Sequence, residues 1–308
     1  MDYQFLTIDM SNNEKIHSFE KTIQEKHWDN DLATRVWWCL ENPLTGKFVC
    51  AIHKKVIVAT ARITTKKIII GENQFTGVEI GDTYTSIEHR RQGLFTKLVK
   101  IAEKEAIAND AELVYGTPNE NSEYGYIKLG YDIVGKDKSS IYKKLYQPYK
   151  IDNKYSYNIY DIEKYISDTI SFPRLNQSNY NVLKWRFNRP NVKFMFAKFE
   201  YKSKAYHVCF REGLPGPVKA FIIVEAFCNN EIITQKDIVP IIDIISNECK
   251  INSTFLFHFY SDSKTIGSLS GVEKYRSFPI NVKFFSVQKF ISSKDWFKHY
   301  HFTDSDYA

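Results

Sequence analysis

The sequence contains little of what marks disulfide-rich, metal-binding or membrane-spanning proteins. Its five cysteines are odd in number and lack C-x-x-C spacing, so they predict reduced thiols, not a disulfide framework or a zinc site. The eight histidines show no metal-ligand spacing, and we expect no metal. No stretch approaches the roughly 20 apolar residues of a membrane span. The first residues, MDYQFLTIDM, lack the basic and apolar segments of a signal peptide, so we expect a cytoplasmic protein.

A strong excess of one charge is also missing. The chain carries 42 Lys+Arg against 36 Asp+Glu, a net charge of +6. Residues 1–150 hold 21 Lys+Arg against 20 Asp+Glu, and residues 151–308 hold 21 against 16. An excess this small and scattered argues against nucleic acid as a partner, but it suits a phosphorylated small molecule. We therefore expect small-molecule substrates, no nucleic acid and no membrane. The sequence leaves the oligomeric state open.

Glycine and proline are scarce, at 13 and 9 residues, which indicates packed helices and strands instead of long linkers. In the first half, hydrophobic periodicity predicts helices over residues 12–27, 93–109 and 124–129. It predicts strands over residues 47–53, 56–65, 67–70, 77–87 and 113–115. This alternation of strands and helices favours an α+β or α/β fold.

The second half repeats the order of the first. The spacing of Trp38, Pro43 and Phe48 is echoed by Trp185, Pro190 and Phe194, and each set precedes a run of strand-forming residues. A strand over 219–227, a helix over 237–250 with Pro240 in its first turn, and a strand over 254–260 follow. With a polar linker over 146–154, this order predicts two duplicated α+β domains, residues 1–148 and 149–308.

The most informative segment is a strand that runs into Arg90-Arg91-Gln92-Gly93-Leu94-Phe95-Thr96 and then into a helix. A strand-to-helix turn of this kind directs backbone N–H groups outward, and the helix dipole adds partial positive charge. An anion such as pyrophosphate can bind there. Gly93 lacks the Cβ that would obstruct close approach. Taken alone, the pattern also fits an ordinary turn with a solvated basic face.

Two motifs in order make the segment more specific. Arg90-x-x-Gly93 after a strand, with Leu98 as the helix leucine, resembles the acyl-CoA pyrophosphate loop of the GNAT superfamily. The run from Tyr126 to Tyr131, YIKLGY, resembles the Tyr-x-Lys-Leu-Gly-Phe ending of the same family. The resemblance covers about residues 35–145. It implies GNAT-like domains, each a mixed, mostly antiparallel sheet flanked by helices, with acyl-CoA (acetyl-CoA or a short hydroxyacyl-CoA) as co-substrate. The cofactor-binding residues that it implies are Thr85, Ile87, Arg90, Arg91, Gln92, Gly93, Leu94, Phe95, Thr96 and Asn121.

The loop departs from the family pattern at two positions. Ile87 stands where a proline is usual, and Phe95 stands where the loop normally ends on a small residue. A side chain at position 95 does not block N–H donation if it points away from the phosphates. The second half contains no Arg-x-x-Gly-x-Gly or Arg-x-x-Gly-x-Ala, so we expect no second cofactor site there.

The chemistry of acyl transfer requires a neutral amine and a proton for the departing thiolate. Tyr126 occupies the position of the family's acid tyrosine and is our candidate for protonating sulfur; its alternative role is a core tyrosine. Glu79 lies in a register that resembles the glutamate base of some family members, and Asp82 is a competing candidate. Strand alternation places the two carboxylates on opposite faces unless a bulge intervenes. A weakly basic amine would require no strong base.

Trp185, Arg186 and Arg189 are candidates for substrate binding, since guanidinium groups can hold a diphosphate while an aromatic ring stacks on a base; Trp185 also fits a core position. The Trp-rich segment WWCLENPLTG and its echo resemble tandem GNAT acyltransferases of surface-polysaccharide pathways. We therefore expect an enzyme that acylates the amine of a nucleotide-linked amino sugar by direct transfer in a ternary complex. The alternatives are a protein-lysine or aminoacyl-type N-acyltransferase and a catalytically inactive acyl-CoA sensor.

Overall fold

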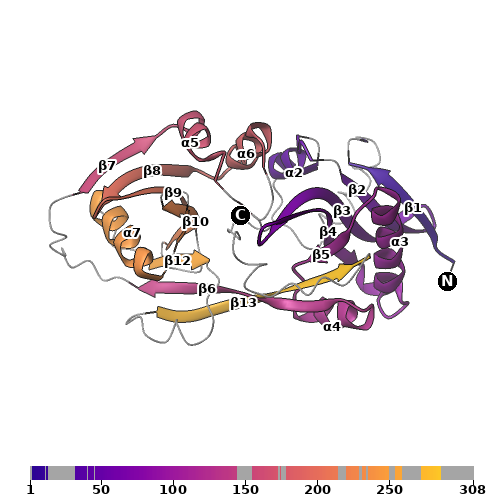
Figure 1. Ribbon diagram of the computed structural model, residues 1–308. Coiled ribbons are helices and arrows are strands. Elements are labelled where there is room, and N and C mark those ends of the chain that lie inside the picture. The colour runs from indigo at the N-terminus through magenta and orange to yellow at the C-terminus, as the bar shows by residue number, and fades with distance from the viewer. Residues whose placement is uncertain are drawn as a thin grey trace. The chain divides into compact units, whose positions relative to one another are not determined.

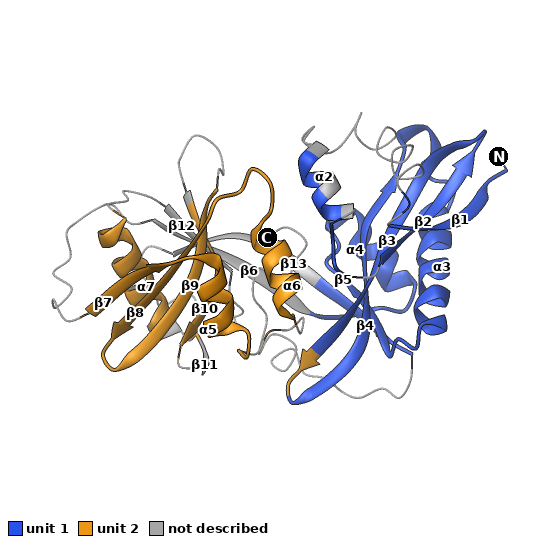
Figure 2. Ribbon diagram, turned by 90° about the horizontal axis from the view of Figure 1, so that it is seen from above, with its two compact units in different colours: residues 1–68, 72–135, 279–293 blue, residues 69–71, 136–278, 294–308 orange. Residues whose placement is uncertain are grey.

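The computed structural model describes residues 2–10, 12, 32–39, 41–44, 46–143, 155–172, 174, 178–213, 220–228, 231–233, 235–249, 254–258 and 272–285. Two compact units are present (Figure 2). The first combines residues 1–68 and 72–135 with 279–293, and the second combines 69–71 and 136–278 with 294–308. Most of the helix expected over 12–27, the linker expected over 146–154 and the boundary expected at 148/149 lie outside the described residues.

The first unit is built on a mixed sheet (Figure 1). Its strands run in the order β1-β2-β3-β4-β5-β13. They are β1 (Gln4–Asp9), β2 (Gly46–His53), β3 (Val56–Ile70), β4 (Asn73–Thr85), β5 (Leu113–Gly116) and the later part of β13 (Val272–Phe284). The pairs β1–β2, β2–β3 and β5–β13 are antiparallel, whereas β4–β5 is parallel. The parallel pairing runs from Gly77–Leu113 to Glu79–Tyr115.

Helices cover both faces of this sheet. The apolar side of α3 (Leu94–Ala108) packs on one face through residues at helical spacing, including Leu94, Leu98 and Ala102. In Figure 2, α2 (Leu32–Cys39) lies on the opposite face, where Trp38 packs near Phe48. The short helix α4 (Glu120–Lys128) follows β5 and begins with a capping box at Asn119.

The strand that completes the first unit comes from far along the chain. In β13, Val282 pairs with Tyr115 of β5, and both Ile280 and Val282 are buried. Lys283 Nζ lies 2.9 Å from Glu103 of α3 and 3.0 Å from the carbonyl oxygen of Leu129 after α4. The sheet, α3 and the end of α4 are therefore held together by a segment that follows most of the second unit in sequence.

The second unit repeats this plan. Its strand order is β6-β12-β10-β9-β8-β7, with the short β11 beside β10. The strands are β6 (Asp132–Lys143), β7 (Tyr155–Tyr160), β8 (Phe194–Tyr201), β9 (Lys204–Gly213), β10 (Ala220–Cys228), β11 (Glu231–Ile232) and β12 (Thr254–His258). The helices are α5 (Ile162–Thr169), α6 (Tyr180–Phe187) and α7 (Gln235–Glu248). The parallel pair β10–β12 corresponds to β4–β5, and the other described pairs are antiparallel. Both units are mixed, mostly antiparallel sheets flanked by helices, which confirms the expected α+β class.

Two details of the expected elements were wrong. The separate strands expected over 56–65 and 67–70 form the single strand β3, because Lys66 is buried in an ion pair with Glu79 and does not interrupt the strand. Pro240 lies inside α7 beyond its first turn, because this helix begins at Gln235. Within the described parts of the chain, no helix combines the length and the apolar character that crossing a membrane would require.

Candidate active site

The loop between β4 and α3 has a defined backbone shape. The N–H of Ser86 donates to the carbonyl oxygen of Val58 at 2.9 Å, which fixes the end of β4 to β3. A 3₁₀ turn, η1 (Ile87–His89), follows, and Arg90 Nε donates to the carbonyl oxygen of Thr85 at 3.2 Å. Arg91 and Gly93 then adopt left-handed backbone conformations, with φ of 62° and 72°. The chain therefore turns sharply just before α3 begins.

This turn exposes the N-terminus of α3. The N–H of Lys97 makes the helix's bond to the carbonyl oxygen of Gly93 at 3.2 Å. The N–H groups of the preceding helical residues, Leu94 to Thr96, therefore point out of the helix start, as at any helix N-terminus. Leu94 is buried, but the sequence-predicted residues Ile87, Arg90, Arg91, Gln92, Gly93 and Thr96 are exposed. A Cβ on Gly93 would meet no atom within 4 Å, so this space is open to a ligand. These features fit the pyrophosphate of acyl-CoA.

Tyr126 lies beside this loop and is buried. Its hydroxyl oxygen lies 4.0 Å from the position that a Cβ on Gly116 would occupy, at the end of β5. Its ring packs against Phe95 of α3. Burial raises the pKa of Tyr126 above its ordinary value of 10.0; a hydrogen bond with Thr83 acts in the opposite direction, and the charge of Glu79 adds to the rise. The hydroxyl therefore keeps its proton at neutral pH.

Both candidate bases are engaged in ion pairs with cations of β3. Glu79 is 1% exposed and pairs with the buried Lys66. Asp82 Oδ2 accepts from Arg62 Nε at 2.6 Å, and the side chain of Arg62 is also buried. Each carboxylate therefore already has a cationic hydrogen-bond donor.

The two carboxylates share a face of the sheet. Their partners Arg62 and Lys66 stand four residues apart on β3, a spacing that places both on one side of a strand. Asp82 has a positive φ of 44°, so β4 is irregular there and the alternation between Glu79 and Asp82 is broken. On this face the Arg62 guanidinium lies 4.7 Å from the ring centroid of Trp38.

Sequence reasoning missed the cations of β3. Their signal was the alternating polar set Arg62, Thr64 and Lys66 in an otherwise apolar strand, and Arg62 Nη1 donates to Thr64 Oγ1. Asn121 is exposed in the first turn of α4, where its N–H donates to Asn119 Oδ1 at 3.0 Å. Among the predicted residues, the structure therefore brings together the Arg90–Thr96 loop and Tyr126.

The candidate substrate residues lie in the second unit. Trp185 is 7% exposed and Arg186 is 6% exposed, so both belong to the packed surface of α6. The Arg186 guanidinium lies 5.9 Å from the Trp185 ring centroid. Arg189 follows α6 and approaches Arg211 of β9, a residue that sequence reasoning did not select. Burial, followed by the positive charge of Arg189, lowers the pKa of Arg211 to about 10.

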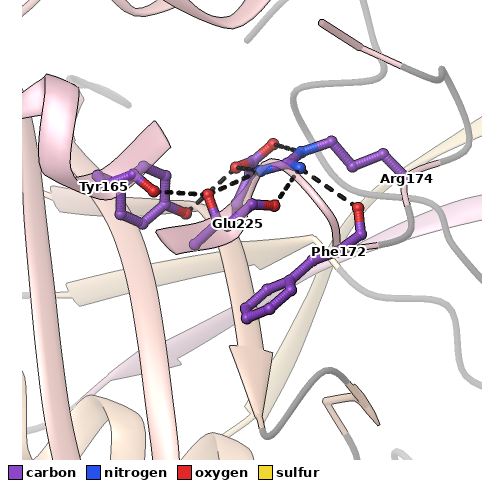
Figure 3. Close-up of polar contacts among 5 residues, drawn as sticks. Tyr165, Phe172, Arg174 and Glu225 are labelled. Atoms are coloured by element: carbon purple, nitrogen blue, oxygen red, sulfur yellow. Dashed lines mark hydrogen bonds and ion pairs between the residues drawn. The ribbon is translucent and has the colours of Figure 1, made fainter. Parts of the chain in front are cut away.

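The core of the second unit also contains a buried ion pair (Figure 3). Arg174 Nε and Nη2 donate to the two carboxylate oxygens of Glu225 at 2.9 and 3.0 Å. The Tyr165 hydroxyl donates to the same carboxylate at 3.2 Å, and Arg174 Nη1 also donates to the Phe172 carbonyl oxygen at 3.4 Å. Glu225 lies next to a register shift in β10, the strand that corresponds to β4 of the first unit. Each unit therefore has an arginine–carboxylate pair whose carboxylate lies on an irregular strand.

Comparison with known proteins agrees with this geometry. Residues 16–134 match the family described as the acetyltransferase (GNAT) domain. None of the curated proteins matches the sequence significantly.

Solved structures resemble both units together. A GCN5-related N-acetyltransferase from Anabaena variabilis ATCC 29413 is 11% identical with a TM-score of 0.65, covering 92% of this chain and 73% of that one. A probable N-acyltransferase from Enterococcus faecalis V583 is 14% identical with a TM-score of 0.66, covering 96% and 75%. A tandem GNAT protein from the clavulanic acid biosynthesis pathway is 9% identical with a TM-score of 0.60, covering 94% and 100%.

At these identities the structural likeness establishes the fold, two GNAT-like domains in tandem. The family match establishes a GNAT acetyltransferase domain in the first half. Residues 16–134 therefore carry a GNAT-type acetyltransferase domain, which supports an acyl-CoA-dependent transferase.

Proposed function

We propose that this protein transfers an acyl group from acyl-CoA to the amine of a nucleotide-linked amino sugar. The observation that carries the proposal is the placement of a protonated, buried Tyr126 beside the exposed start of α3. The Arg90–Thr96 loop would hold the pyrophosphate on backbone N–H groups, with the arginines adding positive charge. Acyl-CoA would supply the thioester whose carbonyl carbon the amine attacks.

Tyr126 would act as the general acid. When the amine nitrogen bonds to the carbonyl carbon, the carbon–sulfur bond breaks and its electron pair remains on sulfur. The Tyr126 hydroxyl donates its proton to that sulfur, and the proton that the amine loses passes to the tyrosinate, directly or through solvent, which restores the acid. The Tyr126 pKa lies above 10.0, so the hydroxyl is in its acid form at working pH and carries the proton to be donated.

The engaged carboxylates support a weakly basic acceptor. Glu79 and Asp82 each already accept from a buried cation, so neither side chain is placed as an unpartnered base. A lysine amine, with an ordinary pKa near 10.4, would need such a base to lose its proton at neutral pH. An amino-sugar amine is less basic, so a larger fraction of it is neutral there. This comparison favours an amino sugar over a protein lysine.

Direct transfer in a ternary complex is the mechanism that we propose. Cys50 of β2 is buried, and this burial raises the pKa of its thiol to about 12. A thiol in that state is a poor nucleophile at neutral pH. A covalent acyl-cysteine at this position is therefore disfavoured, and the amine attacks the thioester itself.

We assign acceptor binding to the second unit, through Trp185, Arg186 and Arg189. Burial, and then the charge of Arg189, lower the pKa of Arg211, and an anion bound beside the two guanidinium groups would offset the repulsion between them. A diphosphate can accept parallel hydrogen bonds from such groups. The change of Arg189 and Arg211 to Gln should raise the KM for the acceptor and leave the KM for acyl-CoA unchanged.

The test is a matrix of short acyl-CoAs against amino-sugar nucleotides, with release of free coenzyme A thiol as the readout. We expect turnover with at least one amino-sugar nucleotide and none with its N-acetylated form, which has no free amine. Turnover with lysine peptides alone would replace the proposed acceptor. Binding of acyl-CoA without transfer to any amine would indicate a sensor.

A further inference from the structure

The ring of Phe95 occupies a place that depends on a glycine in α4. Phe95 is the second residue of α3 and is half-buried. Its Cε1 lies 2.5 Å, and its Cζ 3.2 Å, from the position that a Cβ on Gly125 would occupy. Carbon atoms in packed interiors do not approach to 2.5 Å. The ring therefore fits in this position because residue 125 has no side chain.

The same ring contacts Tyr126. The centroids of Phe95 and Tyr126 are 5.1 Å apart and the ring planes meet at 90°, an edge-to-face arrangement. On Tyr126 a second aromatic contact comes from Tyr131, at 5.0 Å and 74°. The Tyr126 ring is therefore restrained by a residue of α3 and by the residue just before β6, while its hydroxyl interacts with Thr83 of β4.

We propose that Phe95 is a positioning residue for Tyr126, and that Gly125 is its matching small partner. This inference rests on the acid role given to Tyr126 in the proposed function. Phe95 has two roles in the proposed site. Its backbone N–H belongs to the start of α3, where the pyrophosphate is proposed to bind, and its ring restrains Tyr126 of α4. The large residue at position 95 and the glycine at position 125 form one packing unit.

A double-mutant cycle tests the proposal in the full-length protein, with an acceptor found in the acyl-CoA matrix. Phe95→Ala should lower kcat by roughly 10- to 100-fold, because a displacement of about 1 Å in a reacting group can cost that much. In the Tyr126→Phe protein, which has no acid to position, the same change should have little further effect on kcat. Equal losses of kcat in both backgrounds would overturn the proposal.

The KM for acyl-CoA separates positioning from damage to the loop. A positioning role predicts a nearly unchanged KM, whereas a purely structural role predicts the same increase in KM with and without Tyr126. Phe95→Leu, which retains apolar volume without a ring edge, replaces Phe95→Ala if that protein does not fold. Tyr124→Ala is the matched control, since Tyr124 is an exposed aromatic residue of α4, 64% exposed. It should leave kcat unchanged.

The packing of the Phe95 ring against the space left by Gly125 gives a second test. Gly125→Ala should lower kcat because the new Cβ displaces the Phe95 ring. In the Phe95→Ala background the same change should cost nothing more, since the ring is gone; additive losses would contradict the pairing.

A spectroscopic titration removes the dependence on turnover. Proteins with and without Tyr126 are compared by tyrosinate absorbance, and Phe95→Ala should move the pKa of Tyr126 down toward 10.0 by admitting water. An unmoved pKa would overturn the proposal. If Tyr126→Phe retained full kcat while this pKa moved, the acid assignment would fail and the packing unit would stand.

Discussion

Gly93 and Gly130 both hold left-handed backbone conformations, with φ of 72° and 84°, and in both cases an added Cβ would meet no protein atom within 4 Å. They differ in their surroundings, because Gly93 is the N-cap of α3 whereas Gly130 follows α4. A valine would strain the backbone at either position. Only at position 93 would it also stand in the open space from which the phosphate of the proposed cofactor would approach the helix start.

We therefore expect Gly93→Val to weaken coenzyme A binding at least tenfold, or by about 1.4 kcal/mol, measured by calorimetry on folded protein. Gly130→Val is the control: it should reduce stability by a similar amount and leave the affinity unchanged. Equal affinities of the two variants for coenzyme A would show that the pyrophosphate does not bind at this loop.

Tyr126→Phe should lower kcat by roughly 10²–10⁴-fold, the usual cost of losing a general acid, with coenzyme A affinity nearly unchanged. The pH dependence follows from the direction of the shift. Because burial raises the Tyr126 pKa above 10.0, its acid form persists at every pH below that value, and no alkaline decline in kcat below pH 10.0 should come from this residue. Normal turnover by the variant, under conditions where chemistry limits the rate, would make Tyr126 a structural residue.

At the scale of single residues, the local sequence predicted a residue's role well where that role depends on the backbone at the same position. Gly93 was selected because its missing Cβ allows an anion to approach closely; the space that a Cβ would occupy is open, and the backbone there also has a positive φ. Phe95 could be recognised only as a departure from a pattern. Its partner Gly125 lies in another helix, and no local rule connects the two positions. Asp82 was a candidate base whose buried partner Arg62 could not be read from spacing alone.

At the scale of elements, the buried pair of Lys66 and Glu79 joins β3 to β4. Removal of one member leaves the other as an unpaired buried charge, which costs several kcal/mol. Lys66→Met should therefore destabilise the protein by about 3–5 kcal/mol in urea denaturation. The double change Lys66→Met and Glu79→Leu should recover most of that loss, because apolar residues of similar size can replace a buried pair.

The matched control for this prediction is Lys47, whose ion pair with Glu105 has side chains 36% and 29% exposed. Lys47→Met should cost about 1 kcal/mol or less, as for surface pairs. If Lys66→Met were as mild as Lys47→Met, the pair between β3 and β4 would not be holding the strands together.

The same pair explains which elements could be predicted. Helix α3 was predicted closely because its apolar positions recur at helical spacing within the segment itself. The strand β3 was predicted as two pieces divided at Lys66, a charged residue within an apolar run. The burial of Lys66 depends on Glu79, which is local to neither piece. Hydrophobic periodicity predicts an element well when the burial of its residues follows from the segment's own pattern. The prediction fails where burial depends on a partner residue from another part of the chain.

At the scale of the whole molecule, β13 makes the first unit depend on residues near the end of the sequence. Val282→Asp should bury an unpaired carboxylate beside Tyr115 and reduce coenzyme A binding, although the loop lies far away in sequence. Hydrogen exchange at β5 should rise in the same variant. Val56→Asp, at a position 51% exposed in the same unit, is the control and should change neither quantity. Retained affinity in Val282→Asp would mean that β13 is dispensable for the site.

The position of β13 also sets an order of events during synthesis. A ribosome has delivered the loop, Tyr126 and β5 long before Val282, which must pair with Tyr115. At the usual rate of about 5–20 residues per second, β5 waits on the order of ten seconds with one edge unpaired. An unpaired strand edge can join another chain, so nascent copies on one messenger are exposed to misassembly during this interval. Slow translation of the second unit should therefore lower the yield of active protein more than slow translation before β5 does.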